Sequence, residues 1–172
     1  PLMHITNVQQ QKTHPRFADK AFQEGLKWSY EELDQYLSAQ YMAPSGWVFD
    51  TLEPTMKRYL THVFRAAQPS LQPRVGTFGF FAADFIITDQ LQVFITEVQN
   101  GPDLSITSGG VKSRLVKAMV REVLAIQMEV LHRHRSNQPL TVLDSVQEFQ
   151  MLVNEAAVPP WMYSVPTSEG TR

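Results

Sequence analysis

The sequence predicts an α+β fold in which helices pack on an antiparallel β-sheet. Apolar residues recur at helical spacing in several segments, and two consecutive segments rich in aromatic and β-branched residues are typical of paired strands. With 172 residues, of which 43% are hydrophobic and 19% charged, the chain can bury an ordinary core and suits one domain better than two. We expect residues 1–156 to form one folded part and residues 157–172, with three prolines, to form a loosely ordered tail.

The composition excludes several classes of protein. Fifteen Lys and Arg against 17 Asp and Glu give a net charge of −2, which argues against a protein that binds nucleic acid through its phosphates. The absence of cysteine excludes disulfides, thiolate zinc sites and a cysteine nucleophile. The longest stretch without a charged residue, 35–49, is too short to span a bilayer, so we expect no membrane segment. Because the chain starts at Pro1 without a targeting sequence, we expect it to begin inside a longer protein.

Two helices are expected in the first half of the chain. Ser29 and Glu32 have the spacing of a capping box, and apolar residues follow at helical spacing, which predicts a helix over about 29–41. A Pro-Ser-Gly segment ends it. Asp50 is then expected to cap a second helix that ends near Ala67.

The next two segments predict an antiparallel hairpin. Residues 77–87 and 91–98 favour strands and flank a short polar turn. A loop of two or four residues would place Asp84 and Glu97 on one face, and a four-residue loop would place them opposite each other, with Cβ atoms roughly 5 Å apart. Gln99 stays on that side if the extended conformation continues.

This arrangement predicts a metal site. Two carboxylates that share a buried sheet face repel each other unless a proton or a cation intervenes, and Asp84 and Glu97 are expected to be buried. With the amide oxygen of Gln99 they form an oxygen donor set suited to magnesium. Two alternatives remain open: a lysine or arginine from elsewhere neutralises one carboxylate, or a loop with an odd number of residues separates the two.

Two further helices are expected in the second half, over Val111–Arg133 and over 142–154, the latter started by Thr141 and Asp144. The five histidines lack metal-binding spacing, and the glycines have neither dinucleotide-binding nor Walker spacing. No residue is assigned as a catalytic nucleophile or as a general acid or base.

Four segments, in the same order, resemble motifs of the tubulin tyrosine ligase-like family. They are His4-Ile5-Thr6-Asn7 with Lys12, Lys27-Trp28-Ser29, Phe78-Gly79-Phe80-Phe81-Ala82-Ala83-Asp84 with Glu97-Val98-Gln99-Asn100-Gly101-Pro102, and Val111-Lys112 with Leu115. They span roughly residues 3–131. The resemblance implies the C-terminal half of an ATP-grasp ligase domain, with the upstream half of the same domain as its partner.

The resemblance also implies a function. Members of this family activate a carboxylate as an acyl-phosphate with ATP and Mg²⁺, and join it to an amino acid. The usual acceptor is tubulin, which receives tyrosine, glutamate or glycine. The implied site residues are Asp84, Glu97 and Gln99 for magnesium, Thr6 and Asn7 for ATP, and Lys27 and Lys112 for the carboxylate of the amino acid. The implied location is the cytoplasm and the cytoskeleton, including cilia or axonemes.

One departure from the family pattern bears on activity. Gln99 occupies the position of the family's metal-binding asparagine, and its extra methylene displaces the amide oxygen. Asn100 does not replace it simply, because adjacent residues of a strand point to opposite faces. The alternative to an active ligase is therefore an inactive relative that serves as a structural protein of microtubules or axonemes.

Overall fold

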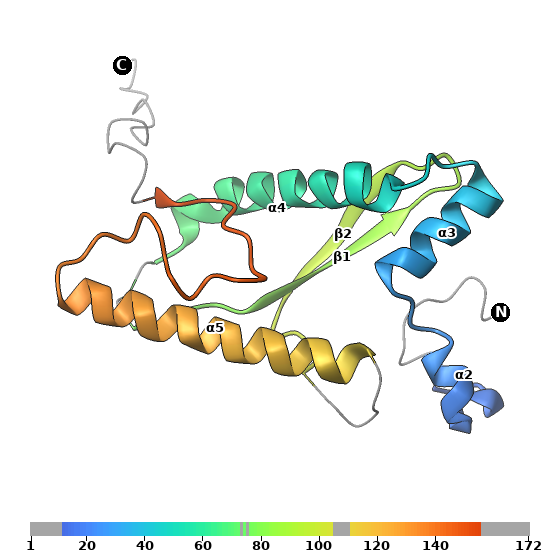
Figure 1. Ribbon diagram of the computed structural model, residues 1–172, viewed down its shortest axis with the longest axis horizontal. Helices are drawn as coiled ribbons and strands as arrows, with labels where there is room; N and C mark the ends of the chain where they lie inside the picture. Colours follow the sequence, from blue (N-terminus) through green and yellow to red (C-terminus); the bar gives the residue numbers. More distant parts are fainter. Residues whose placement is uncertain (1–11, 73, 75, 105–110, 156–172) are drawn as a thin grey trace, which may run out of the picture. The chain divides into compact units, whose positions relative to one another are not determined.

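The computed structural model describes residues 12–72, 74, 76–104 and 111–155 (Figure 1). In this part of the chain, a two-stranded antiparallel sheet is accompanied by four α-helices, which confirms the predicted α+β class. The chain divides into two compact units: Pro1–Tyr59 with Phe81–Val116, and Leu60–Phe80 with Lys117–Arg172.

The first described elements of the chain are short helices whose N-termini are capped by side chains. Asp19 accepts a hydrogen bond from the backbone of Ala21 and caps α2, Lys20–Glu24. The predicted capping box is confirmed: Ser29 accepts from the backbone N–H of Glu32, and the Glu32 carboxylate accepts from that of Ser29. These bonds satisfy donors that a helix start leaves free, and they fix the start of α3, Tyr30–Tyr41.

The following helix starts differently from the prediction. A π-helical turn, Val48–Leu52, leads into α4, Glu53–Ala67. Asp50 lies inside that turn and is exposed, so its predicted capping role is wrong. The cap comes instead from Asp34 in α3, whose carboxylate accepts from the backbone N–H of Gly46 at 2.8 Å and of Val48 at 2.9 Å. Sequence spacing could not reveal this cap, because Asp34 is distant along the chain.

The hairpin strands are β1, Phe81–Ile87, and β2, Val93–Asn100, so the predicted hairpin is confirmed. One face of the hairpin closes the core of the first unit through the buried Val93, with Phe85 and Ile87 packed beside it. The other buried members of this core are Leu37, Ala43, Trp47, Val48 and Leu52. The hairpin is therefore held by one face, and most side chains of its other face are exposed among the residues that the structure describes; we call this the open face.

The second unit contains most of α5, Val111–Arg135, which matches the predicted long helix. The helix predicted over 142–154 is wrong, because this stretch contains no helix. Carboxylates of α5 bind its backbone instead: Glu129 accepts from the N–H groups of Asp144 and Ser145, and Glu122 accepts from those of Gln147, Glu148 and Phe149.

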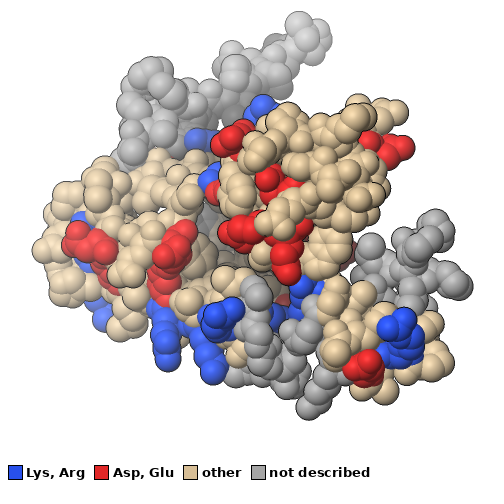
Figure 2. Space-filling model, turned by 45° about the vertical axis from the view of Figure 1, so that its right-hand side comes forward, with Lys and Arg blue, Asp and Glu red and all other residues tan. Residues whose placement is uncertain are grey.

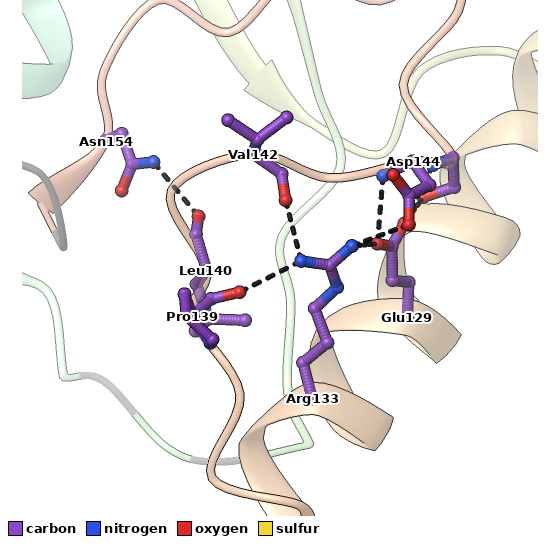
Figure 3. A network of polar contacts seen from close by, with 8 residues as sticks. Glu129, Arg133, Pro139, Leu140, Val142, Asp144 and Asn154 are labelled. Atoms are coloured by element: carbon purple, nitrogen blue, oxygen red, sulfur yellow. Dashed lines mark hydrogen bonds and ion pairs between the residues drawn. The ribbon is translucent and has the colours of Figure 1, made fainter.

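An arginine of α5 completes this attachment (Figure 3). Arg133 donates to the carbonyl oxygens of Pro139 at 3.0 Å and Val142 at 2.8 Å, and it pairs with Asp144 and Glu129. The side-chain amide of Asn154 donates to the carbonyl of Leu140 at 3.0 Å. Tertiary hydrogen bonds to α5 thus hold this segment of bends and turns, in place of the bonds that a helix would make within itself.

No helix in the described ranges is both long and apolar enough to cross a lipid bilayer.

Candidate functional site

The register of the hairpin brings three predicted ligands to one face. Asp84 lies opposite Glu97, and Ala82 lies opposite Gln99. Because β2 stays extended as far as Asn100, Glu97 and Gln99 project to the same side, as predicted. Opposed side chains in an antiparallel pair have Cβ atoms about 4.5–5.5 Å apart, so the two carboxylates can reach a common cation. The small side chain of Ala82 leaves space beside Gln99.

This register arises by a route that the sequence did not predict. The turn has three residues between the paired Thr88 and Gln92, and not two or four: the Thr88 N–H donates to the Gln92 carbonyl at 2.9 Å. Leu91 closes the turn in the left-handed conformation, with φ 59°. The hydroxyl of Thr88 accepts from the backbone N–H groups of Gln90 and Gln92 and fastens the turn.

A β-bulge then changes the register between the turn and the candidate site. Phe85 pairs with Ile95 and Asp84 pairs with Glu97, so Thr96 is an extra residue in β2. Without it, the pairing set by the odd-numbered turn would place Asp84 opposite Thr96 and send Glu97 to the other face. The odd loop that was expected to separate the carboxylates is therefore present, and the bulge compensates for it.

The carboxylates lie on the open face of the hairpin. Asp84, Glu97 and Gln99 are all exposed, so the predicted burial of the two carboxylates is wrong within this chain. Ile86 and Phe94 form the next pair on the same face and are also about half exposed, at 51% and 49%. An open face that carries both acidic and apolar side chains can receive a ligand that has charged and apolar parts.

The donor set fits magnesium in its chemistry. Two carboxylates and one amide oxygen are hard donors, and Mg²⁺ usually takes only one or two protein carboxylates while it keeps waters and substrate phosphates. Within the described residues, no group of three or more His, Cys, Asp and Glu side chains is placed to hold a metal ion. The site therefore suits a cation that arrives with a phosphate ligand better than one held entirely by protein.

Two lysines, Lys27 and Lys112, are predicted to bind the amino acid. Contacts of the residues around them determine where each one lies. Lys112 lies in the first turn of α5 and pairs with the carboxylate of Asp103 at 2.5 Å. Lys27 is exposed and directly precedes Trp28, whose indole N–H donates to the carbonyl of Gly25 at 3.2 Å. The Trp28 ring also packs edge-on against Tyr36, at 4.8 Å between centroids, and so fixes the chain beside Lys27.

The other predicted site residues, Thr6 and Asn7, lie outside the described residues. Two residues that touch the candidate site were not predicted from the sequence. Asp103 forms an ion pair with Lys112. The sequence offered one sign of this pair, an acidic residue a short distance before α5. Thr96 produces the bulge, and no local pattern marked it.

Charge on the surface agrees with the sequence. Figure 2 shows both acidic and basic side chains on the face in view, as expected for a chain whose net charge is −2.

The motifs and the hairpin site agree with a comparison to known families. The model of the family described as "Tubulin-tyrosine ligase family" matches residues 1–138. The chain belongs to this family. The predicted family is thereby confirmed, and the matched range includes the hairpin and α5 of this tubulin-tyrosine ligase family member.

Several curated relatives are similar over most of the chain. The human protein named "Inactive polyglycylase TTLL10" is 31% identical over 91% of this chain and 23% of its own length. The macaque (Macaca fascicularis) "Protein polyglycylase TTLL10" is 31% identical over 90% of this chain and 25% of its own length. The zebrafish (Danio rerio) "Tubulin monoglycylase TTLL3" is 26% identical over 91% of this chain and 19% of its own length.

The chain spans about a quarter or less of the length of these relatives. No solved structure matches this family member. The relatives' names concern the modification of proteins by glycine, and in one case tubulin is named as the protein modified.

Proposed function

We propose that this chain is part of an ATP-dependent ligase that joins an amino acid to tubulin, with Mg²⁺ held by Asp84, Glu97 and Gln99. The observation that carries the proposal is the register of the hairpin, which opposes the two carboxylates on an open face with Gln99 on the same side. Residues 1–156 would form the C-terminal part of an ATP-grasp domain, and residues 157–172 would form its tail.

The lysines would bind the amino acid. In the structure, the ammonium group of Lys112 already pairs with a carboxylate, that of the exposed Asp103. An exposed ion pair of this kind contributes about 0–1 kcal/mol, so a substrate carboxylate can displace Asp103 at little cost. Lys27 would provide a second positive charge, and Thr6 and Asn7 would contact ATP.

The reaction would proceed in two steps. A carboxylate oxygen of the acceptor attacks the γ-phosphorus of ATP, and ADP leaves with the electrons of the broken P–O bond. The amino group of the amino acid then attacks the acyl carbon, phosphate leaves, and the nitrogen loses a proton as the amide forms. Asp84, Glu97 and Gln99 would hold magnesium, which would supply positive charge to neutralise the phosphoryl oxygens. The hairpin's role would be to keep these three ligand residues on one face before ATP binds, which lowers the cost of bringing them together.

Glycine is the amino acid that we propose, because relatives that match 90–91% of the chain are named a polyglycylase and a monoglycylase. A rat relative is named "Probable tubulin polyglutamylase TTLL9", at 27% identity over 62% of the chain, so glutamate is the competing substrate. Tyrosine follows only from the family name. The protein would act in the cytoplasm on the cytoskeleton, including cilia or axonemes.

A second candidate function is a structural one, in which an inactive relative binds microtubules without ligating amino acids. Gln99 favours this alternative, because the longer side chain puts its oxygen farther from the strand than an asparagine would. The human relative named as inactive also supports it.

Titration of the full-length protein with ATP, with and without Mg²⁺, tests the proposed function. We expect Mg²⁺-dependent binding that Glu97→Gln weakens on the order of 100-fold, because the substitution removes one charge from the donor set. Asp89→Asn is the matched control, since Asp89 is an exposed acidic residue in the turn of the same hairpin. Absence of Mg²⁺-dependent binding to the wild-type protein, or equal binding by Glu97→Gln, would contradict the proposed metal site.

A further inference from the structure

The bulge at Thr96 is tied to one of the proposed ligands. Thr96 has no partner in the strand pairing, and its hydroxyl donates to the backbone carbonyl of Asp84 at 3.0 Å. Thr96, the extra residue of β2, is thus hydrogen-bonded to Asp84 of β1. The register changes directly next to Asp84.

Two registers are geometrically possible at this point of the hairpin, and the structure has one of them. The pairing near the turn, from Ile87 with Val93 to Phe85 with Ile95, would continue on an unbroken ladder as Asp84 opposite Thr96 and Ala83 opposite Glu97. That alternative keeps every ladder position filled, but it turns Glu97 toward the face that packs on the core. The observed register gives up regular pairing at one residue and keeps Glu97 on the open face.

From this geometry we propose that Thr96 is a positioning residue, whose hydroxyl holds the bulge and thereby keeps Glu97 and Gln99 on the same face as Asp84. The meaning of this role for catalysis rests on the proposed function. The role in register does not, so it can be tested without metal or nucleotide.

Pairs of introduced cysteines report the register directly. The chain contains no cysteine, so each introduced pair is unambiguous within it. Asp84→Cys with Glu97→Cys reports the observed register, because opposed Cα atoms lie about 4.5–5.5 Å apart and disulfides need about 4.4–6.8 Å. Ala83→Cys with Glu97→Cys reports the alternative register, since in the observed one these positions face opposite ways.

The experiment measures how much of each disulfide forms in the full-length protein in a glutathione buffer, with the cross-linked peptides identified by mass spectrometry. We expect the 84–97 disulfide to dominate with Thr96 in place. Thr96→Val, which removes only the hydroxyl from a side chain of the same shape, should lower the ratio of the 84–97 to the 83–97 disulfide by about fivefold, as expected for one lost hydrogen bond. Thr96→Ser should restore the ratio.

A deletion provides an independent variant. Removing Thr96 takes out the extra residue, so a regular ladder then places Asp84 opposite Glu97 without a bulge. The deletion should keep the ratio of the 84–97 to the 83–97 disulfide as high as it is with Thr96 in place, whereas Thr96→Val should lower this ratio. An unchanged ratio in Thr96→Val, no recovery in Thr96→Ser, or loss of the 84–97 disulfide in the deletion would each overturn the positioning role.

Binding measurements separate this inference from the proposed function. If ATP binding depends on Mg²⁺, Thr96→Val should weaken it by a similar factor of about five, and Thr96→Ser should not. A shift in the disulfide ratio together with no Mg²⁺-dependent binding in the wild-type protein would leave the role of Thr96 standing and remove the proposed function. Mg²⁺-dependent binding with an unchanged disulfide ratio would do the reverse.

Discussion

At the scale of single residues, the open face of the hairpin carries two carboxylates and one amide, that of Gln99. Gln99 has a longer side chain than the asparagine of the family motif. Gln99 is exposed and lies opposite the small Ala82, so its side chain has room to move. A glutamine loses more rotamer freedom on binding a cation than a shorter asparagine does. If the three residues hold Mg²⁺ as proposed, the side chain at position 99 would influence how tightly they bind it.

Gln99→Asn should strengthen Mg²⁺-dependent ATP binding by about tenfold, because the shorter side chain returns the amide oxygen to the asparagine position and has fewer torsions to fix. Isothermal titration of the full-length protein measures the change. Gln92→Asn is the control for the same chemical substitution, at an exposed position just before β2. If the variant binds no more tightly than the wild type, Gln99 is not a ligand. If binding appears only in the variant, the inactive, structural reading of the wild-type protein gains support.

At the scale of elements, α3 and the π-helical turn before α4 are joined by one carboxylate. Asp34 accepts two backbone N–H groups, from Gly46 and Val48, and Val48 is fully buried. Gly46 has φ +82°, and a Cβ there would lie 3.1 Å from the carboxylate of Asp50, so glycine is needed at this position. The Asp34 contact therefore anchors the helix start to the core.

Asp34→Ala should reduce the free energy of unfolding by about 1–2 kcal/mol, the usual cost of removing a side-chain cap. The measurement is equilibrium unfolding in urea monitored by circular dichroism. Asp50→Ala is the matched control, because Asp50 is the residue that spacing alone favours as the cap and it is exposed. A larger loss of stability in the control than in Asp34→Ala would show that the cap has been assigned to the wrong aspartate.

The same elements show how far sequence reasoning reached. Local signals predicted α3, its capping box, the long α5 and the hairpin, because each depends on residues close together in the chain. The predicted helix over 142–154 failed because Glu122 and Glu129 bind the backbone of that segment, and these contacts are remote in sequence.

Only part of the candidate site could be predicted, because local patterns show which residues favour a strand but do not fix how two strands pair. The strand pattern favoured the facing of Asp84 and Glu97, but the loop length and the bulge that produce it were not predicted. Thr96 fits the strand pattern as well as its neighbours do, so nothing local distinguished it as the extra residue. The exposure of the carboxylates could not be deduced either, since period-two alternation does not say which face is covered.

At the scale of the whole molecule, stability depends on acidic groups that are held ionised. Hydrogen bonds, first from the Ser145 hydroxyl and then from the Asp144 N–H, lower the pKa of Glu129 to about 2. The pKa of Glu122 is also lowered, because N–H donors from Gln147, Phe149 and Glu148 outweigh the opposing effect of burial. Both carboxylates therefore stabilise the fold when they are charged.

The pH dependence of unfolding should reveal the contribution of Glu129. Because its pKa is lower in the folded state than the ordinary 4.5, its contribution is present above about pH 4.5 and disappears as the pH falls toward about 2. In Glu129→Gln this part of the acid sensitivity should be missing, and stability at neutral pH should be lower than in the wild type. Thermal unfolding at a series of pH values measures both effects. Glu148→Gln is the control, since its side chain is exposed; an identical pH profile for Glu129→Gln and the wild type would contradict the assignment.

Besides its two faces, the hairpin has two edges, one along β1 and one along β2. In the described part of the chain its sheet consists of β1 and β2 alone, so each strand presents an outer row of backbone donors and acceptors. Such rows are templates on which further strands can assemble, and a two-stranded ribbon gains most of its rigidity when it is widened in this way. Polypeptide from outside these residues could extend the sheet sideways on either edge and leave the acidic face accessible.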